Sequence, residues 1–205
     1  MRTNCWIRCR VMSGLVAALS LCVVAPRTLA DQGTAPNSKE KADDAAAFRE
    51  FSDRVQTYVK LQRTVEASLP TLKATDLPEM ITAHQQALAR KIREARPHAK
   101  AGDIFTPEAR EAFRHASRAA LGGPRSANSR AHPPSDEPNP GMRLVVNGIY
   151  AGTEPITELP PALLAAFPPL PAEVAYRIVG RTLILIDVKS RLIVDVARLI
   201  LPPPS

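Results

Sequence analysis

The chain has 205 residues, of which 45% are hydrophobic, 23% are charged and 4% are aromatic, and its formal net charge is +7. This length suits one compact domain. The composition excludes collagen-like chains, coiled-coil rods and proteins that cross a membrane many times. It leaves the function open.

The first thirty residues have the pattern of a secretory signal peptide. Arg2, Arg8 and Arg10 precede an apolar stretch over residues 11–25, and the small residue Ala30 closes the segment. A basic start, an apolar run of about 7–15 residues and a small residue at the cleavage position are typical of such peptides. We therefore expect export to the periplasm or beyond, with cleavage after Ala30. A retained membrane anchor is the alternative, but the apolar stretch is shorter than the ~20 residues that span a bilayer.

All cysteines of the chain, Cys5, Cys9 and Cys22, lie within this segment. The exported chain would then lack disulfides, thiolate nucleophiles and cysteine-ligated zinc. Lipidation at Cys22 stays an alternative, although lipoprotein boxes favour a smaller residue than Leu21 before the cysteine. Removal of the segment lowers the net charge to +3, from 23 basic and 20 acidic residues. An exported protein of this charge is a poor candidate for nucleic-acid binding.

Three helices are predicted for residues 42–121, after a polar and disordered leader over residues 31–41. The first helix ends at Pro70. Its apolar stripe could form a core or bind a partner, and it consists of Phe48, Phe51, Val55, Tyr58, Val65 and Leu69. The second helix starts at Pro78 with Asp76 as its cap and ends before Pro97. Its inner face consists of Ile81, His84, Leu88, Ile92 and Ala95.

The third helix starts at Thr106 and Pro107, a capping residue followed by proline at the first helical position, and Gly122 stops it. Its inner face consists of Ala109, Phe113, Ala116 and Ala120. Three helices with short connections predict a small antiparallel helical unit.

Residues 122–143 are rich in Gly, Pro, Ser, Asn and Arg, which predicts a flexible, proline-rich linker. Residues 144–205 form a small β-rich region. It begins with a strand over 144–150 that contains an Asn-Gly turn, followed by a short helix over 159–167. Three strands, at 174–179, 182–188 and 192–196, predict an antiparallel β-meander. The predicted fold class is therefore α+β.

A turn of three residues at 189–191 would pair Val188 with Leu192 and Leu185 with Asp195. In this register one sheet face is buried and carries Ile184, Ile186, Val188, Val194 and Val196. Tyr176 and Ile178 join that face if the first turn also has three residues. The other face is half-exposed and carries Arg177, Asp187, Arg191 and Asp195 among Leu185 and Ile193.

Two stretches, Gly102–Pro107 and Tyr176–Asp195, resemble an uncharacterised family of exported bacterial proteins. The order of helices, proline-rich joint and terminal strands is similar as well. The resemblance implies export and a shared fold. It implies no activity and no catalytic residue.

The sequence offers few sites for chemistry. His84, His98, His115 and His132 do not form the spacings of zinc sites. His84 lies on an apolar helix face, as core histidines do, whereas His98 and His115 could meet Asp103 at a weak metal site. Phosphate-binding glycine loops and Gly-x-Ser-x-Gly are absent. A Ser-His-Asp triad has no fixed order in sequence and stays open. We expect no metal and no cofactor.

Asp187 and Asp195 are the alternative catalytic pair. Two carboxylates on one sheet face could perform acid–base hydrolysis of a glycosidic bond. Arg177 and Arg191 are close enough in the predicted sheet to neutralise them. The favoured interpretation is therefore a set of ordinary ion pairs across strands at the surface.

Residues 90–130 carry ten basic and four acidic residues. Arg110, Arg114 and Arg118 follow one another at four-residue steps, so they form a ridge along the third helix, here called the basic ridge. Like charges at this spacing cost a few tenths of a kcal/mol, so nearby acids, solvent or an anionic partner must compensate.

These features predict a non-enzymatic interaction module of the periplasm or cell envelope. Its partner would be an envelope protein, an acidic glycan or a lipid headgroup, and the basic ridge would contact it. Two alternatives remain open. One is a periplasmic hydrolase that depends on carboxylates. The other is an accessory subunit whose apolar helix stripe completes the helical bundle of another envelope protein.

Overall fold

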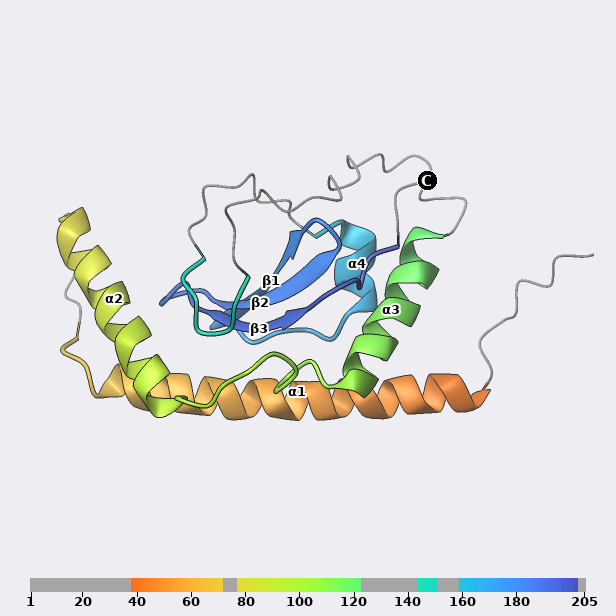
Figure 1. Ribbon diagram of the computed structural model, residues 1–205, viewed down its shortest axis with the longest axis horizontal. Helices are drawn as coiled ribbons and strands as arrows, with labels where there is room; N and C mark the ends of the chain where they lie inside the picture. Colours follow the sequence, from red (N-terminus) through yellow and green to blue (C-terminus); the bar gives the residue numbers. More distant parts are fainter. Residues whose placement is uncertain (1–37, 72–76, 123–143, 151–158, 203–205) are drawn as a thin grey trace, which may run out of the picture. The chain divides into compact units, whose positions relative to one another are not determined.

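The computed structural model describes residues 38–71, 77–122, 144–150 and 159–202. Helices come first in this part of the chain and a three-stranded sheet comes last: α1 (Ser38–Ala67), α2 (Pro78–Ala95), α3 (Pro107–Leu121), α4 (Pro161–Ala166), β1 (Val174–Val179), β2 (Thr182–Asp187) and β3 (Ile193–Ala197). The strands are antiparallel in the order β1-β2-β3 (Figure 1). The predicted α+β class is confirmed. The predicted signal peptide with its cysteines, His132 and the linker from 123 to 143 lie outside the described residues.

α1 begins earlier than the sequence pattern indicated. It starts at Ser38, inside the segment predicted as a leader, and ends at Ala67, before Pro70. Acidic residues at 40, 43 and 44 lie in its first two turns, where a carboxylate interacts favourably with the helix dipole. The alanines at 45–47 have the highest helix propensity. Local preference therefore starts the helix before its apolar stripe begins.

α2 packs through its C-terminal half only. Its buried residues are Leu88, Ala89 and Ile92, whereas Ile81 is 40% exposed and Ala95 is exposed. The predicted inner face is thus wrong at both ends. The first turns of α2 extend away from α1 (Figure 1), which exposes Ile81, and Ala95 is exposed in the last turn. Leu77 occupies the N-cap and no side chain caps the helix. Asp76, the predicted cap, lies outside the described residues.

α3 starts as the sequence predicts. The Thr106 hydroxyl accepts a hydrogen bond from the backbone N–H of Ala109 at 3.2 Å, and Pro107 occupies the first turn. Ala109 and Phe113 of the predicted inner face are buried, and Ala116 and Ala120 pack against the core. The short helix α4 also forms within its predicted range.

The sheet register is partly as predicted. Leu185 faces Asp195 as expected, but a one-residue shift follows and places Ile186 opposite Ile193. The turn between β1 and β2 has two residues, Gly180 and Arg181, and Gly180 has a φ of +56°. A change of one residue in a turn moves every side chain of a strand to the opposite face. Tyr176 and Ile178 therefore lie beside Leu185 and Leu183 and not beside Ile184 and Ile186.

Both faces of the sheet are covered, which corrects the prediction of one half-exposed face. Every residue of β2 and β3 is buried. The helices cover the face that carries Leu183 and Leu185. On the other face, Ile184 and Ile186 cluster with Leu144 and Tyr150 from residues 144–150 and with Val179, Ile193 and Val196.

The segment 144–150 is a turn and not the predicted strand. One bridge joins Ile149 to Leu192, and the Asn147 N–H donates to the Ile193 carbonyl at 2.8 Å. Asn147 has a φ of +63°, a conformation that asparagine tolerates better than most residues. The segment reaches the sheet through these contacts and covers one of its faces.

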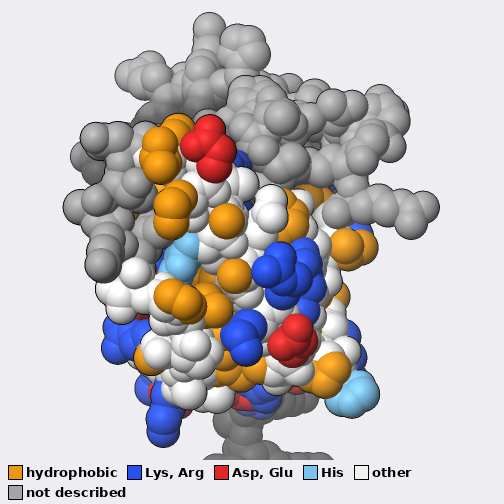
Figure 2. All heavy atoms as spheres, turned by 90° about the vertical axis from the view of Figure 1, so that its left-hand side faces the viewer, with side chains coloured by type: hydrophobic (Ala, Val, Ile, Leu, Met, Phe, Trp, Pro, Cys, Tyr) orange, Lys and Arg blue, Asp and Glu red, His pale blue; other side chains and the backbone are white. Residues whose placement is uncertain are grey.

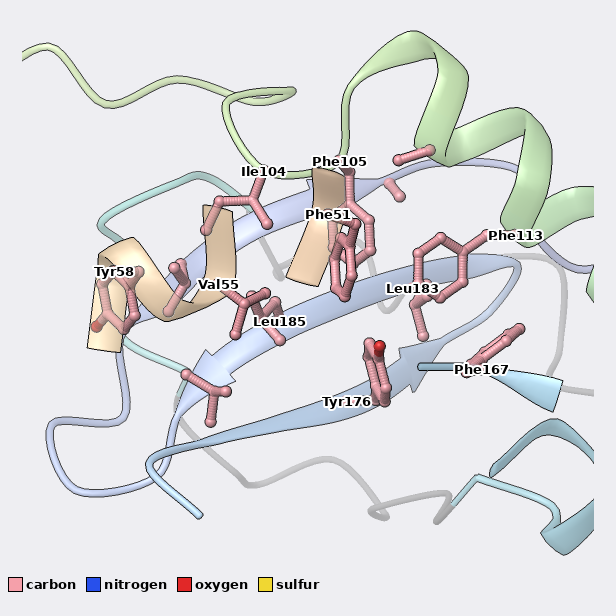
Figure 3. Packing of buried hydrophobic residues seen from close by; sticks show 14 of the residues in the cluster. Phe51, Val55, Tyr58, Ile104, Phe105, Phe113, Phe167, Tyr176, Leu183 and Leu185 are labelled. Carbon is pink, nitrogen blue, oxygen red and sulfur yellow. The ribbon is translucent and has the colours of Figure 1, made fainter. Parts of the chain in front are cut away.

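An aromatic cluster joins the helices to the sheet (Figure 3). Phe113 of α3 lies at its centre, with ring centroids 5.0 Å from Phe51 of α1, 4.7 Å from Phe167 and 5.9 Å from Tyr176 of β1. Phe51 also stacks on Phe105 at 5.2 Å. The helical region and the β-rich region therefore share one hydrophobic core.

Candidate functional site

The basic ridge lies on the side of α3 that faces away from the core. The helix buries Ala109, Ala112, Phe113 and Ser117. Arg118 is exposed, and Arg110 and Arg114 are half-exposed. Arg114 forms an ion pair with Glu111 one turn earlier. Among the described residues, no ion pair includes Arg110 or Arg118. Two of the three guanidinium groups thus have no carboxylate partner there.

Acidic residues on the same helix stay charged beside the ridge. The hydrogen bond from Arg114 holds the pKa of the Glu111 carboxyl below its usual range. The backbone N–H of Glu108 and the Thr106 hydroxyl lower the pKa of Glu108 in the first turn of α3. Both carboxylates are therefore ionised at neutral pH. They partly compensate the positive charges of the ridge.

An open groove of about 700 Å³ runs between the first half of α1 and α3. Carboxylates dominate its lining, so we call it the acidic groove: Glu40, Asp43, Asp44, Glu50, Glu108 and Glu111. The basic groups in its lining are Lys39 and His115. α3 therefore has a basic ridge and also borders a strongly acidic groove.

His115 lies among three of these carboxylates. Its Nδ1 atom is 3.1 Å from Asp44 Oδ1 and 3.3 Å from Glu40 Oε1, and its Nε2 atom is 3.1 Å from Glu111 Oε1. This cluster was not predicted, since His115 was considered only with His98 and Asp103. The spacing of these residues could have indicated the cluster. Glu40 and Asp44 are four residues apart and share one helix face, and the same holds for Glu111 and His115.

Asp195 is buried and anchors the loop before α3 to the sheet. Its carboxylate accepts hydrogen bonds from the backbone N–H groups of Gly102 at 2.9 Å and of Ile104 and Phe105, both at 2.7 Å. Gly102 has a φ of +93°, which favours glycine. Asp195 thus holds a sharp turn. The glycine of this turn, Gly102, is evident in the sequence, but its partner Asp195 lies far along the chain in β3.

Asp187 is also buried and connects α1 to the turn after β2. It accepts a hydrogen bond from the Tyr58 hydroxyl at 2.9 Å and from the Ser190 N–H at 2.6 Å. Burial and the neighbouring Asp187 raise the pKa of Tyr58 far above its ordinary value. The guanidinium carbon of Arg96 lies 5.0 Å from the centre of the Tyr58 ring. This arrangement holds a neutral phenol against the carboxylate.

These contacts correct the predicted roles of both aspartates. Asp187 and Asp195 have no exposed surface, and they are not surface ion pairs: none of those found in the described residues includes either one. Arg177 pairs with Ile184 across the strands, so it lies on the sheet face opposite to the one that carries the two aspartates. Arg191 is exposed. The two carboxylates are occupied by hydrogen bonds that hold the fold.

The weak alternative of a metal site at His98, His115 and Asp103 gains no support from the structure. His98 is exposed, and Asp103 accepts a hydrogen bond from the Lys100 N–H at 2.9 Å. His84 is half-buried on α2. Within the described ranges, no group of three or more His, Cys, Asp or Glu side chains has the geometry to hold a metal ion.

A second, shallower groove of about 470 Å³ lies between α1 and α4. Phe48, Arg49 and Asp53 of α1 line it, together with Phe167 after α4. Neither this groove nor the acidic groove is lined by Asp187 or Asp195. The structure therefore gives no access for a substrate to these carboxylates through either groove.

Apolar side chains reach the surface on the first turns of α2. Leu77, Met80 and Ile81 are 56%, 53% and 40% exposed. Figure 2 looks at this side of the molecule and shows hydrophobic side chains among basic and polar ones. Across the described part of the chain, no helix combines the length and apolar character that a membrane span requires.

Comparison with known proteins gives no relative for this chain: no family model, no curated protein and no solved structure matches it. The resemblance to exported bacterial proteins therefore stays a prediction.

Proposed function

We propose that this chain is a non-enzymatic interaction module that acts in the periplasm or cell envelope. The observation that carries the proposal is the burial of Asp187 and Asp195, the candidate catalytic pair of the sequence analysis. Their carboxylates accept hydrogen bonds from the backbone and from Tyr58. Catalysis would require free carboxylates that reach a substrate. The most direct enzymatic alternative therefore loses its support.

The basic ridge is the surface that we propose for binding. Arg118 projects into solvent, and Arg110 lies two turns away on the same side of α3. Positive side chains fixed at regular spacing on a well-packed helix attract anionic groups. The acidic groove lies beside the ridge, so an anion is attracted to one side of α3 and repelled from the other. This asymmetry would orient an acidic glycan, a lipid headgroup or an acidic protein on the helix.

Export is part of the same proposal and rests on the first thirty residues of the sequence. Their basic start, apolar run and small closing residue support secretion. Extraction of the periplasm from cells that produce the full chain tests this part. Recovery of a shortened protein that begins at Asp31 supports it, whereas a full-length protein in the cytosol contradicts it.

The binding surface is tested with the variant R110Q/R114Q/R118Q and two anionic probes. These are vesicles that contain phosphatidylglycerol and a soluble acidic polysaccharide. We expect the unmodified chain to bind one of them at low salt and to release it at high salt, because salt screens exposed charges. The triple variant should bind at least about tenfold more weakly, since several charge-assisted contacts are lost together.

A matched control removes the same charge elsewhere. The variant R49Q/R90Q/K91Q also loses three exposed basic side chains, from α1 and α2. It should retain binding if the ridge is the site. Equal losses in both variants would show a general charge effect, and unchanged binding in the triple ridge variant would refute the assignment to Arg110, Arg114 and Arg118.

The accessory-subunit alternative has one observation in its favour. Leu77, Met80 and Ile81 expose apolar surface on α2, and such patches often mark contacts with another protein. The stripe of α1 that the sequence analysis offered for this role is occupied by the core instead. A partner that is retained at high salt and lost in the variant M80S/I81S would favour this alternative over the basic ridge.

A further inference from the structure

Arg110 and Arg118 form the two ends of the basic ridge. They are eight positions apart on one continuous helix, so their Cα atoms are separated by about 12 Å along the axis of α3. Among the described residues, no ion pair includes either guanidinium group. Glu108 and Glu111 of the same helix interact with them electrostatically without forming an ion pair. The ridge therefore carries at each end a positive charge that an anion can reach.

The centre of the ridge differs from its ends, because Arg114 already has an anionic partner. Its guanidinium group donates to the Glu111 carboxylate one turn earlier, and the two side chains form an ion pair. A ligand that binds Arg114 has to displace this carboxylate or bear its repulsion. Opposite charges in contact largely cancel each other for a ligand farther away. An anion therefore gains most at the two ends of the ridge and least at its centre.

The acidic groove limits the shape of the ligand. Glu108 and Glu111 of α3 belong to its lining, together with four carboxylates of α1. An anionic surface broad enough to cover α3, such as a bilayer, would bring its charges toward these carboxylates and would be repelled. A narrow chain can follow the ridge without crossing the groove. The pattern of charges therefore favours a linear anion.

The chemistry of the outer side of α3 narrows the class of ligand further. None of the large hydrophobic side chains that are exposed in the described part of the chain belongs to α3, and its aromatic residue Phe113 is buried. A helix on a membrane surface inserts apolar side chains, the centre of a protein interface is apolar, and single-stranded nucleic acid stacks its bases on aromatic rings. α3 offers none of these contacts on its outer side. Carboxylates, in contrast, are bound by guanidinium groups through paired hydrogen bonds.

We infer that the ligand of the basic ridge is a linear acidic polysaccharide that lies along α3 and contacts Arg110 and Arg118 through two separate carboxylates. The inference rests on the proposed binding by the ridge, and it adds which anion binds and where its charges lie. Two contacts made by one chain reinforce each other when the chain spans both. Affinity should therefore depend on the length of the polysaccharide and not only on its charge.

The test is calorimetric titration of the purified chain at low salt with oligomers of galacturonic acid, which carry one carboxylate per sugar. We expect the tetrasaccharide to bind at least about tenfold more tightly than the disaccharide, because only the longer chain spans both arginines. The hexasaccharide should gain less than about threefold over the tetrasaccharide, since both ends of the ridge are already occupied. The methyl-esterified tetrasaccharide is the matched ligand control, and it should not bind because its charges are removed.

Three variants locate the contacts. R110Q/R118Q should bind the tetrasaccharide at least about tenfold more weakly and should no longer distinguish it from the disaccharide, whereas R114Q should lose less than about threefold. R49Q/R90Q removes two exposed arginines from α1 and α2, and it should bind as the unmodified chain does. Glutamine has nearly the helix propensity of arginine, so these changes leave the helices intact.

The outcomes separate this inference from the proposed function. Binding to phosphatidylglycerol vesicles or to a single-stranded oligonucleotide, without binding to the tetrasaccharide, overturns the inference and leaves the ridge as a surface for another anion. Equal affinity for the disaccharide and the tetrasaccharide overturns it too, as does a larger loss in R114Q than in R110Q/R118Q. An absence of binding to every probe refutes the proposed function and this inference with it.

Discussion

At the scale of single residues, two buried aspartates connect the sheet to the helical part of the fold. Asp195 of β3 accepts hydrogen bonds from Gly102, Ile104 and Phe105, and Asp187 of β2 accepts one from Tyr58. A buried polar group that loses its partner carries the full cost of its desolvation. These aspartates are therefore structural residues, and their substitution should change stability before it changes any other property.

Asp195→Ala tests this role. The substitution leaves the N–H groups of Ile104 and Phe105 buried and without an acceptor, so we expect a loss of about 3–5 kcal/mol in the free energy of unfolding. Urea unfolding followed by circular dichroism measures it. The exposed Asp53 of α1 supplies the control, since Asp53→Ala should change stability by less than about 0.5 kcal/mol. A loss below about 1 kcal/mol in Asp195→Ala would contradict the role.

Among the secondary-structure elements, α3 takes part in the core, in the acidic groove and in the outer surface. It contributes Phe113 to the core, His115 to the acidic groove and the basic ridge to the outer surface. Its start is fixed by the Thr106 cap, which follows directly on the turn that Asp195 holds. Position and orientation of the ridge therefore depend on the Thr106 cap and on the adjacent turn, which Asp195 holds from β3.

Removal of the cap should weaken the whole protein by a modest amount. We expect Thr106→Ala to lower the free energy of unfolding by about 1 kcal/mol, because one backbone N–H in the first turn of α3 loses its acceptor. Thr106→Ser retains the hydroxyl and should recover more than half of that loss. Thermal denaturation of the three proteins side by side measures the difference. Equal losses in both variants would show that packing of the threonine methyl group, and not the cap, is responsible.

For the molecule as a whole, the described helices and the sheet share one hydrophobic core. The aromatic cluster draws side chains from α1, α3 and β1 and from the segment between α4 and β1. The opposite face of the sheet is covered by residues 144–150. Neither the helical region nor the β-rich region can bury its apolar face without the other. A segment such as 42–121 by itself would expose the surfaces of Phe51 and Phe113 that pack against Tyr176 and Phe167.

This arrangement predicts a single unfolding transition. Far-ultraviolet circular dichroism follows the helices and near-ultraviolet circular dichroism follows the tyrosines, and we expect coincident midpoints from the two signals. Phe113→Ala should shift both midpoints together, with a loss of about 3–5 kcal/mol. Leu164→Ala, at an exposed position on α4, should leave them nearly unchanged. Two separated transitions in the unmodified chain would refute a shared core.

Local sequence determined most of the helices and strands, although it also predicted a strand at 144–150 that does not form. The repeat of apolar residues in α1, the Thr106–Pro107 start of α3 and the dense β-branched runs of β1–β3 depend on neighbours a few positions away, so they could be predicted. The basic ridge was predicted for the same reason, since four-residue steps on a helix define a face. The start of α1 was missed because its first turns are stabilised by charge and propensity and not by apolar periodicity.

The tertiary structure alone decided which faces are buried and what the charged residues do. The two-residue turn at Gly180 placed Tyr176 on the helix side of the sheet, and contacts over more than ninety positions buried Asp195 beneath the turn at Gly102. His115 met Asp44 across 71 positions of the chain. Such contacts follow from how helices and strands pack, and packing depends on shape and register that no local pattern records. The same aspartates that could have formed a catalytic pair thereby became anchors of the fold.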